Sequence, residues 1–429
     1  MEKLEQELIG NQTTQKKRII YLTGNAGVGK STLAYYFAEK YEKDKNKFKD
    51  GIVGLRVNSE EKETQLSIAR RLINLLKKHD RTIELNDEEH AIDAIKYFFS
   101  SKEFLIILDN ASKNIVDILC NLFYDNHSRC AVIVTTRDQD LSKYVETFVE
   151  ADSTTINIPK FEIYESLELV KEFMEKKDFD KREQYIAEEI VRIIDNLPLA
   201  LRISGSTLKG FKERYKDNSE KYYEELEKYT NSLRNAKERL KQIDQSGYNW
   251  SELENEQYHW SVEASLEISL NLLTTNERDE IISFFASLSV CAEEGFSQEA
   301  AKVISNCDEA STSKYLNRLC TLSLIDQSGD NTSYYVLHPL VYSFACNKLK
   351  ELPTQNDQLQ ERHAEFFLKK VKLFDTDENY ENLEEDKPNI LKALAWLEQA
   401  LFQTSQMKEL RERKKTFKRF LLRRLSTFL

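Results

Sequence analysis

Residues 18–32 of the chain read Arg-Ile-Ile-Tyr-Leu-Thr-Gly-Asn-Ala-Gly-Val-Gly-Lys-Ser-Thr. An apolar run typical of a β-strand leads into the pattern Gly-x-x-x-x-Gly-Lys-Ser at residues 24–31, and a helical pattern follows from Leu33. Strand, glycine-rich loop and helix in this order are typical of a loop that binds phosphate groups. The chain has only 11 glycines, and three of them lie between residues 24 and 29, which argues against a chance match.

Each residue type in this loop has a physical role at a phosphate group. Gly24, Gly27 and Gly29 can adopt backbone conformations that a Cβ atom would forbid, so that successive N–H groups can point toward phosphate oxygens. The ammonium of Lys30 can reach the outer phosphates, and the hydroxyl of Ser31 can bind Mg²⁺. The loop therefore predicts a nucleotide site that uses Mg²⁺.

The composition limits the class of protein. A length of 429 residues favours about two to four domains, and the 40% apolar and 31% charged residues are typical of globular domains. The net charge of −11 argues against non-specific binding of nucleic acid. No apolar run reaches the roughly 18 residues of a membrane span, and the six cysteines show no Cys-x-x-Cys spacing. Because the N-terminus does not resemble a signal peptide, we expect a cytoplasmic protein with reduced cysteines.

A second strong signal is the apolar run at residues 104–108, which Asp109 follows. Such a run predicts a strand buried on both faces of a parallel sheet, and an acid at its carboxyl end lies where these sheets bind ligands. We therefore expect Asp109 to position Mg²⁺; the alternative is an acid that only ends the strand. Asn110 stands where many ATPases of this type have a second acid. Since an amide cannot act as a general base, we expect at most a slow ATPase.

A further buried strand is expected at residues 131–136, and Arg137 follows it. A guanidinium at this edge could contact the γ-phosphate; the alternative is a surface arginine paired with a nearby acid. Strands are also expected at residues 52–57 and 155–158. Residues 18–158 therefore predict an α/β domain of three layers with a parallel sheet, preceded by a short helical lead at residues 1–17.

The remainder of the chain is predicted to be mainly helical. Residues 159–255 form the next expected domain, with amphipathic helices at 164–176 and 183–195 and a densely charged helical stretch at 211–245. Residues 351–429 are expected to be helical as well.

Residues 256–350 favour a winged helix, in which three helices precede a β-hairpin. The helices are expected near 281–290, 297–305 and 311–322, and the hairpin strands near 323–325 and 334–337. Winged helices often bind DNA, but residues 283–350 hold five Lys or Arg and seven Asp or Glu, a net charge of −2. A nucleic-acid partner is therefore not favoured.

The last stretch differs in charge from the rest of the chain. Residues 411–429 contain eight Lys or Arg and one Glu, with apolar residues at near-helical spacing. One interpretation is a helix that contacts an anionic membrane or a partner. The interpretation that we favour is a helix whose apolar face packs on further chain.

The order of these motifs resembles that of the NB-ARC ATPases, which belong to the STAND class of P-loop signalling proteins. Residues 24–31 resemble the Walker A motif of the family, residues 105–109 its Walker B motif and residues 134–137 its sensor strand. Asn196-Leu-Pro-Leu-Ala-Leu201 resembles the motif that the family writes as GLPLAL, and Leu337-His-Pro-Leu340 resembles the motif that ends its winged helix.

The resemblance implies a role for each matched residue. Gly24, Gly27, Gly29, Lys30, Ser31 and Thr32 would bind the nucleotide, and Ser31 and Asp109 would hold Mg²⁺. The resemblance also implies that Arg137 senses the γ-phosphate and that Pro198 packs near the adenine. It further implies that His338 reaches the β-phosphate of ADP; the alternative for a lone His before Pro is an ordinary turn residue.

The resemblance implies a regulatory switch that binds ADP in a closed state and self-associates after exchange to ATP. It also implies that the winged helix is followed by helical repeats, and Glu361 to Glu398 resembles the start of a tetratricopeptide-type array that could contact a protein partner. Pro339 departs from the Asp that the family usually has after the His. The other hypotheses are a turnover ATPase that acts as a motor or loader on nucleic acid or protein, and a scaffold that no longer binds nucleotide.

Overall fold

The computed structural model describes residues 1–9, 18–42, 44, 47–57, 68–69, 71–73, 75, 102–112, 115, 118–119, 130–138, 140–146, 152–245, 253–271, 273, 278–328, 331–374, 383 and 385–403. These residues form two compact units, one within residues 1–160 and one within residues 161–424. The predicted basic helix at residues 411–429 lies outside the described residues. Among the helices that are described, none is long and apolar enough to cross a membrane.

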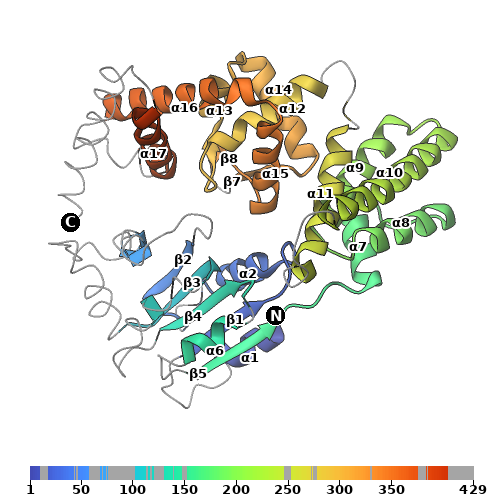
Figure 1. The fold of residues 1–429 in the computed structure, drawn as a ribbon. Coiled ribbons are helices and arrows are strands. Elements are labelled where there is room, and N and C mark those ends of the chain that lie inside the picture. The colour runs from blue at the N-terminus through green and yellow to red at the C-terminus, as the bar shows by residue number, and fades with distance from the viewer. Residues whose placement is uncertain are drawn as a thin grey trace. The chain divides into compact units, whose positions relative to one another are not determined.

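The first unit is built on a parallel sheet of five strands (Figure 1). The strands are β1 (Arg18–Thr23), β2 (Gly51–Arg56), β3 (Phe104–Ala111), β4 (Ala131–Thr136) and β5 (Asp152–Asn157). They lie in the order β2-β3-β4-β1-β5, so that β4 separates β1 from β3. The predicted parallel α/β sheet is confirmed.

Both faces of the sheet are covered, which explains the continuous apolar runs of its central strands. On one face, Leu105 and Ile107 of β3 pack in a cluster with α1 (Glu2–Ile9) and α2 (Lys30–Glu42). On the other face, Ile106 and Leu108 join a second cluster that includes α6 (Leu141–Glu146). Successive residues of a strand point to opposite faces, so each face buries every second residue.

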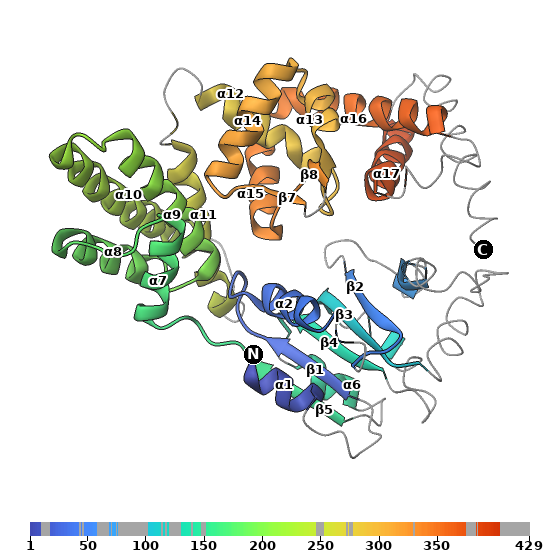
Figure 2. The same cartoon turned by 180° about the vertical axis from the view of Figure 1, so that it is seen from behind.

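The second unit begins with a group of helices. These are α7 (Ile163–Phe173), α8 (Lys181–Ile193), α9 (Pro198–Arg214), α10 (Ser219–Gln245) and α11 (Leu253–Asn271), seen from both sides in Figures 1 and 2. The densely charged stretch at 211–245 is helical over most of its length, as expected. Its sparse apolar residues Leu226, Tyr229 and Leu233 are buried, because they recur on one face of α10.

The next elements run helix, strand, helix, helix, strand, strand. They are α12 (Arg278–Ser287), β6 (Phe296–Ser297), α13 (Gln298–Ser305), α14 (Glu309–Thr321), β7 (Asp326–Ser328) and β8 (Asn331–Val336), with a short 3₁₀ helix η2 (Leu288–Val290) after α12. The three strands form an antiparallel sheet in the order β6-β8-β7. The sequence does not predict the strand after the first of these helices, and the winged helix expected over residues 256–350 stays a prediction.

One strand of the hairpin begins later than predicted. The expected strand at residues 323–325 is wrong, because β7 starts at Asp326. Ser323 has φ = 56° and ends the turn after α14, while Leu324 and Ile325 are buried without joining the ladder. Three further helices follow, namely α15 (Pro339–Lys350), α16 (Pro353–Phe374) and α17 (Lys387–Gln403).

Candidate functional site

The glycine-rich loop joins β1 to α2 in the first unit. Gly24, Gly27 and Gly29 have φ values of 137°, 75° and 98°, which lie in the region that favours glycine. At Gly24 space is limiting as well, since a Cβ atom would lie 2.8 Å from the carbonyl oxygen of Ile158. The loop therefore needs glycine for its backbone path, as its sequence predicts.

Lys30 is the first residue of α2, and its side chain folds back over the loop. Its Nζ atom donates to the carbonyl oxygens of Gly24 (2.7 Å) and Asn25 (2.8 Å). Burial and the nearby charge of Arg137 lower the pKa of Lys30 to about 8, while Asp109 opposes this change. The ammonium therefore lies against the loop, where it can bind a phosphate group.

Ser31 and Asp109 lie in contact beneath the loop. The Ser31 hydroxyl donates to Oδ1 of Asp109 at 2.5 Å, and only 6% of Asp109 is exposed. The order of the strands explains this hydrogen bond, because β3 ends at the same edge of the sheet as the loop after β1. A hydroxyl and a carboxylate are hard oxygen donors, which fit Mg²⁺.

Thr135 of β4 is a second hydroxyl on the same carboxylate, and sequence reasoning missed it. Its Oγ1 atom donates to Oδ1 of Asp109 at 2.5 Å and accepts from the backbone N–H of Asn110 at 2.8 Å. The available signal was a threonine at the carboxyl end of a buried strand, the edge of the sheet at which Asp109 is also expected. Because β4 lies next to β3, this hydroxyl holds the orientation of the carboxylate.

Asn110 occupies the place of the missing second acid. It has φ = 59°, a conformation that asparagine tolerates better than most residues. Its Nδ2 atom donates to the carbonyl oxygen of Val57 at 3.4 Å. The amide therefore ties the end of β3 to the chain after β2, and it offers no carboxylate that could act as a base.

Arg137 and Thr32 are the remaining residues of the first unit that the sequence predicts for the nucleotide site. Arg137 follows β4 directly and is exposed, and its charge reaches Lys30 strongly enough to lower the pKa of that ammonium. Thr32 lies in the first turn of α2 and is exposed. The first unit therefore brings Lys30, Ser31, Asp109 and Arg137 to one edge of the sheet.

Residues 1–180 match the family model of the NB-ARC domain. This part of the chain is an NB-ARC domain. Comparison with curated proteins finds no match. The assignment agrees with the glycine-rich loop, the acid of β3 and the arginine after β4, all of which lie within the matched residues.

The fold is also similar to solved structures. A Signal Transduction ATPase with Numerous Domains (STAND) protein with a tetratricopeptide repeat sensor from Pyrococcus horikoshii is 15% identical, with a TM-score of 0.50 over 98% of this chain. This chain spans 57% of the length of that protein. The ORC2 protein of Aeropyrum pernix in its ADPNP-ADP complexes is 15% identical, with a TM-score of 0.36 over 82% of this chain and 93% of that one. Cdc6p from Pyrobaculum aerophilum is 12% identical, with a TM-score of 0.39 over 82% of this chain and 93% of that one.

Pro198 and His338 belong to the second unit, and their predicted roles at the nucleotide stay predictions. Pro198 is the first residue of α9, where its missing N–H is harmless. His338 is the N-cap of α15, and its Nδ1 atom accepts from the backbone N–H of Leu340 at 3.2 Å. This contact gives the imidazole a local role in helix capping beside the role expected from the NB-ARC resemblance.

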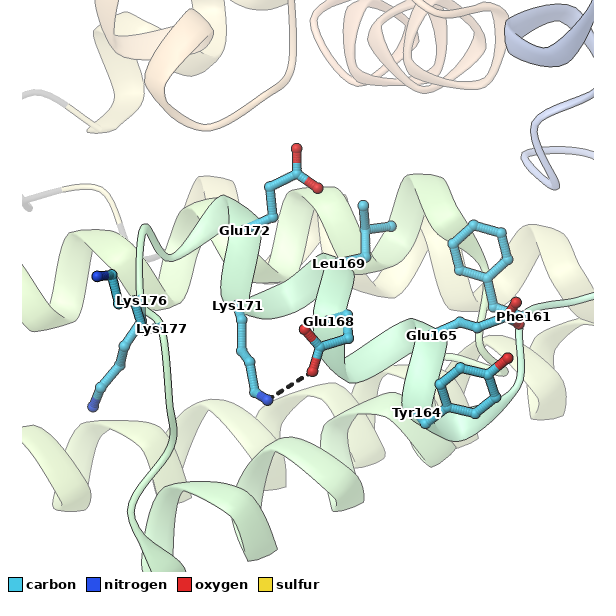
Figure 3. A pocket seen from close by; sticks show the side chains of 9 residues that line it. All are labelled: Phe161, Tyr164, Glu165, Glu168, Leu169, Lys171, Glu172, Lys176 and Lys177. Carbon is cyan, nitrogen blue, oxygen red and sulfur yellow. Dashed lines mark hydrogen bonds and ion pairs between the residues drawn. The ribbon is translucent and has the colours of Figure 1, made fainter.

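A surface pocket of about 610 Å³ lies along α7 in the second unit. Figure 3 shows the side chains that line it, among them Phe161, Tyr164 and the ion pair of Lys171 with Glu168 at 2.7 Å. Its lining contains none of the residues that the sequence predicts for the NB-ARC site. The lysines and glutamates are mixed along its wall, so the pocket presents no single charge to a ligand.

Proposed function

We propose that this chain is a regulatory switch that binds ADP and ATP with Mg²⁺ and changes conformation when one replaces the other. The observation that carries the proposal is the contact of Ser31 with Asp109 beneath the Lys30 loop. A cation, a hydroxyl and a buried carboxylate are the three groups that P-loop proteins use for phosphate and Mg²⁺.

The side chains at this edge of the sheet contact different parts of the bound nucleotide. The glycine loop and the N-terminus of α2 offer backbone N–H groups to the phosphates, while Lys30 exchanges its two carbonyl acceptors for phosphate oxygens. Ser31 and Asp109 hold Mg²⁺, which neutralises phosphate charge when bound, and Thr135 keeps the carboxylate oriented. Arg137 contacts the γ-phosphate and so distinguishes ATP from ADP.

Hydrolysis is at most slow in this proposal. A P-loop ATPase needs a group that orients or deprotonates the attacking water, and Asn110 supplies no carboxylate for it. A bound nucleotide then persists long enough to report a state. This property suits a switch better than a motor, which depends on rapid turnover.

In this proposal, residues of the second unit make the conformation depend on which nucleotide is bound. Pro198 packs near the adenine, and His338 contacts the β-phosphate of ADP and favours the closed state. A ligand shifts such an equilibrium only by its different affinity for the two states, so the γ-phosphate must act through Arg137. The open state self-associates, and the helices after residue 350 contact a protein partner in the cytoplasm.

The first test is the nucleotide that the protein carries after purification. A nucleotide that dissociates slowly stays bound through purification, and at about a thousand times its dissociation constant it stabilises the fold by roughly 4 kcal/mol. We expect near-stoichiometric ADP in the denatured supernatant, its loss in Lys30→Ala, and its retention in Lys40→Ala. Lys40 is the matched control, since it lies on the same helix and pairs with Glu5 on the surface. An empty site that hydrolyses added ATP rapidly would overturn the switch and favour a motor.

A further inference from the structure

Asp109 belongs to β3, and each of the two strands that flank β3 has an arginine at its carboxyl end. The sheet order β2-β3-β4 places Arg56, the last residue of β2, on one side and Arg137, which follows β4, on the other. Arg56 is paired with Asp109 in the parallel register of β2 and β3. Neighbouring strands lie about 4.8 Å apart, which is less than the length of an extended arginine side chain.

The side chain of Arg56 belongs to the face of the sheet that carries α2. Val53 and Leu55 of β2 pack in the cluster on the opposite face, so Gly54 and Arg56 must point toward α2. Asp109 points to this face too, because it accepts a hydrogen bond from Ser31 at the start of α2. Arg56 and the carboxylate that would position Mg²⁺ therefore share one face and one edge.

Tyr35 restricts the direction of the Arg56 side chain. It lies one turn after Ser31 on α2, and its Cε1 atom is 2.9 Å from the place where a Cβ of Gly54 would be. Although 41% of Tyr35 is exposed, its hydroxyl is also near this glycine, at 3.5 Å from the same point. The ring fills the space above Gly54, which is the space that the Arg56 side chain would need in order to run back along the strand.

Two further observations agree with this placement. Burial raises the pKa of the Tyr35 phenol, Asp109 raises it further and Arg56 lowers it, so that both charges act on one hydroxyl. The backbone of Arg56 is also held, because its carbonyl oxygen accepts from Nη2 of Arg71 at 2.7 Å. The end of β2 is therefore a defined position beside the nucleotide site.

We propose that Arg56 is a second arginine for the γ-phosphate, which it contacts from the β2 side while Arg137 contacts it from the β4 side. This inference rests on the proposed nucleotide function and makes Arg56 a residue that determines specificity for ATP over ADP. A planar guanidinium can bind two phosphate oxygens at once, and a charged hydrogen bond is about twice as strong as a neutral one. With Lys30, the site then has three cations around one carboxylate, which favours the nucleotide with the larger negative charge.

The test compares the affinities of MgADP and of a non-hydrolysable ATP analogue by titration calorimetry. In Arg56→Ala we expect the affinity for the ATP analogue to fall about tenfold to a hundredfold and the affinity for ADP to change less than twofold. Arg56→Lys keeps the positive charge but lacks the planar guanidinium that can bind two oxygens, so its affinity for the ATP analogue should lie between those of the Ala variant and the wild type. Arg192→Ala is the control, since this exposed arginine pairs with Glu188 on α8.

The outcomes separate this inference from the function on which it rests. If Arg56→Ala and Arg56→Lys weaken both nucleotides equally, or neither, Arg56 does not contact the γ-phosphate and the inference is overturned while the switch stands. If the wild-type chain binds neither nucleotide, the proposed function fails and the inference falls with it. If Arg56→Ala does not fold, the test uses Arg56→Lys alone. If Arg56 contacts the γ-phosphate, the ratio of the affinity for the ATP analogue to the affinity for ADP must be lower in Arg56→Lys than in the wild type. Tyr35→Phe retains the ring and should leave that ratio unchanged.

Discussion

Arg202 of α9 donates through both terminal nitrogens to the carboxylate of Asp326 in β7, one of these bonds measuring 3.0 Å. The pair joins the helical group of the second unit to its small antiparallel sheet. Close to it, the hydroxyls of Ser206 and Ser323 share a buried hydrogen bond of 2.7 Å. These two contacts between α9 and the β7 region are both polar.

We expect Arg202→Ala to lower the free energy of unfolding only slightly, by about 1 kcal/mol or less, because the pair is partly exposed. If the sheet moves away from α9 in the ATP state, the same variant should raise the oligomeric fraction in ATP. Light scattering with and without ATP measures this fraction. Arg192→Ala removes a comparable surface pair within α8 and should leave it unchanged. A double-mutant cycle with Asp326→Ala isolates the energy of the pair.

The two roles of His338 can be separated by the choice of substitution. His338→Asn keeps a good N-cap for α15 and removes the imidazole that would contact ADP. We expect this variant to retain the thermal stability of α15 and to show a larger oligomeric fraction with ATP, because the closed state loses a contact. If its size distribution equals that of the wild type while His338→Ala unfolds at lower temperature, helix capping is the whole role of His338.

Asp109→Asn should abolish the gain in nucleotide affinity that Mg²⁺ provides. The amide keeps the shape but removes the negative charge that a divalent cation requires, so affinities with Mg²⁺ and with EDTA should become equal. Fluorescence titration with a labelled ADP measures both. Asp140→Asn is the control, since this exposed acid pairs with Lys143 away from Ser31. A Mg²⁺ dependence that survives Asp109→Asn would assign the metal to other oxygens.

Asn389 of α17 is expected to be important for stability. Its Oδ1 atom accepts from the backbone N–H of Ala292 at 2.7 Å, and its Nδ2 atom donates to the carbonyl oxygen of Gly295 at 2.8 Å. Asn389→Ala leaves both buried backbone groups without this partner and should lower the free energy of unfolding by about 2–4 kcal/mol. Chemical denaturation measures the change, and Asn347→Ala on the surface of α15 should have little effect.

His363 should make the protein less stable in mild acid. Burial lowers its pKa from 6.5 to about 3, although its bond with Asn389 opposes this change. The unfolded chain therefore binds the proton first, so stability is fully present above pH 6.5 and is lost as the pH falls toward 3. At pH 5 the loss is on the order of 2 kcal/mol. His363→Gln should be less sensitive than the wild type between pH 7 and pH 5, and equal sensitivity would contradict this assignment.

Several features of the nucleotide domain follow from short stretches of sequence. The runs at residues 104–108 and 131–136 predict buried strands because no polar residue except threonine interrupts them, and both strands are found. The glycines of the 24–29 loop predict its conformation, since positive φ angles favour glycine. These predictions succeed because they depend on a few neighbouring residues.

Local patterns were therefore sufficient to predict the strands of the nucleotide domain, its glycine-rich loop and four candidate residues, namely Lys30, Ser31, Asp109 and Arg137. The position of β4 between β1 and β3 is known only from the fold, and it explains why Thr135 and Ser31 both donate to the carboxylate of Asp109. The pairing of Arg56 with Asp109 and the start of β7 at Asp326 are likewise known only from the fold. The physical reason is that strand pairing and side-chain contacts join residues far apart in the chain, whereas local pattern describes only which face and which element each residue prefers.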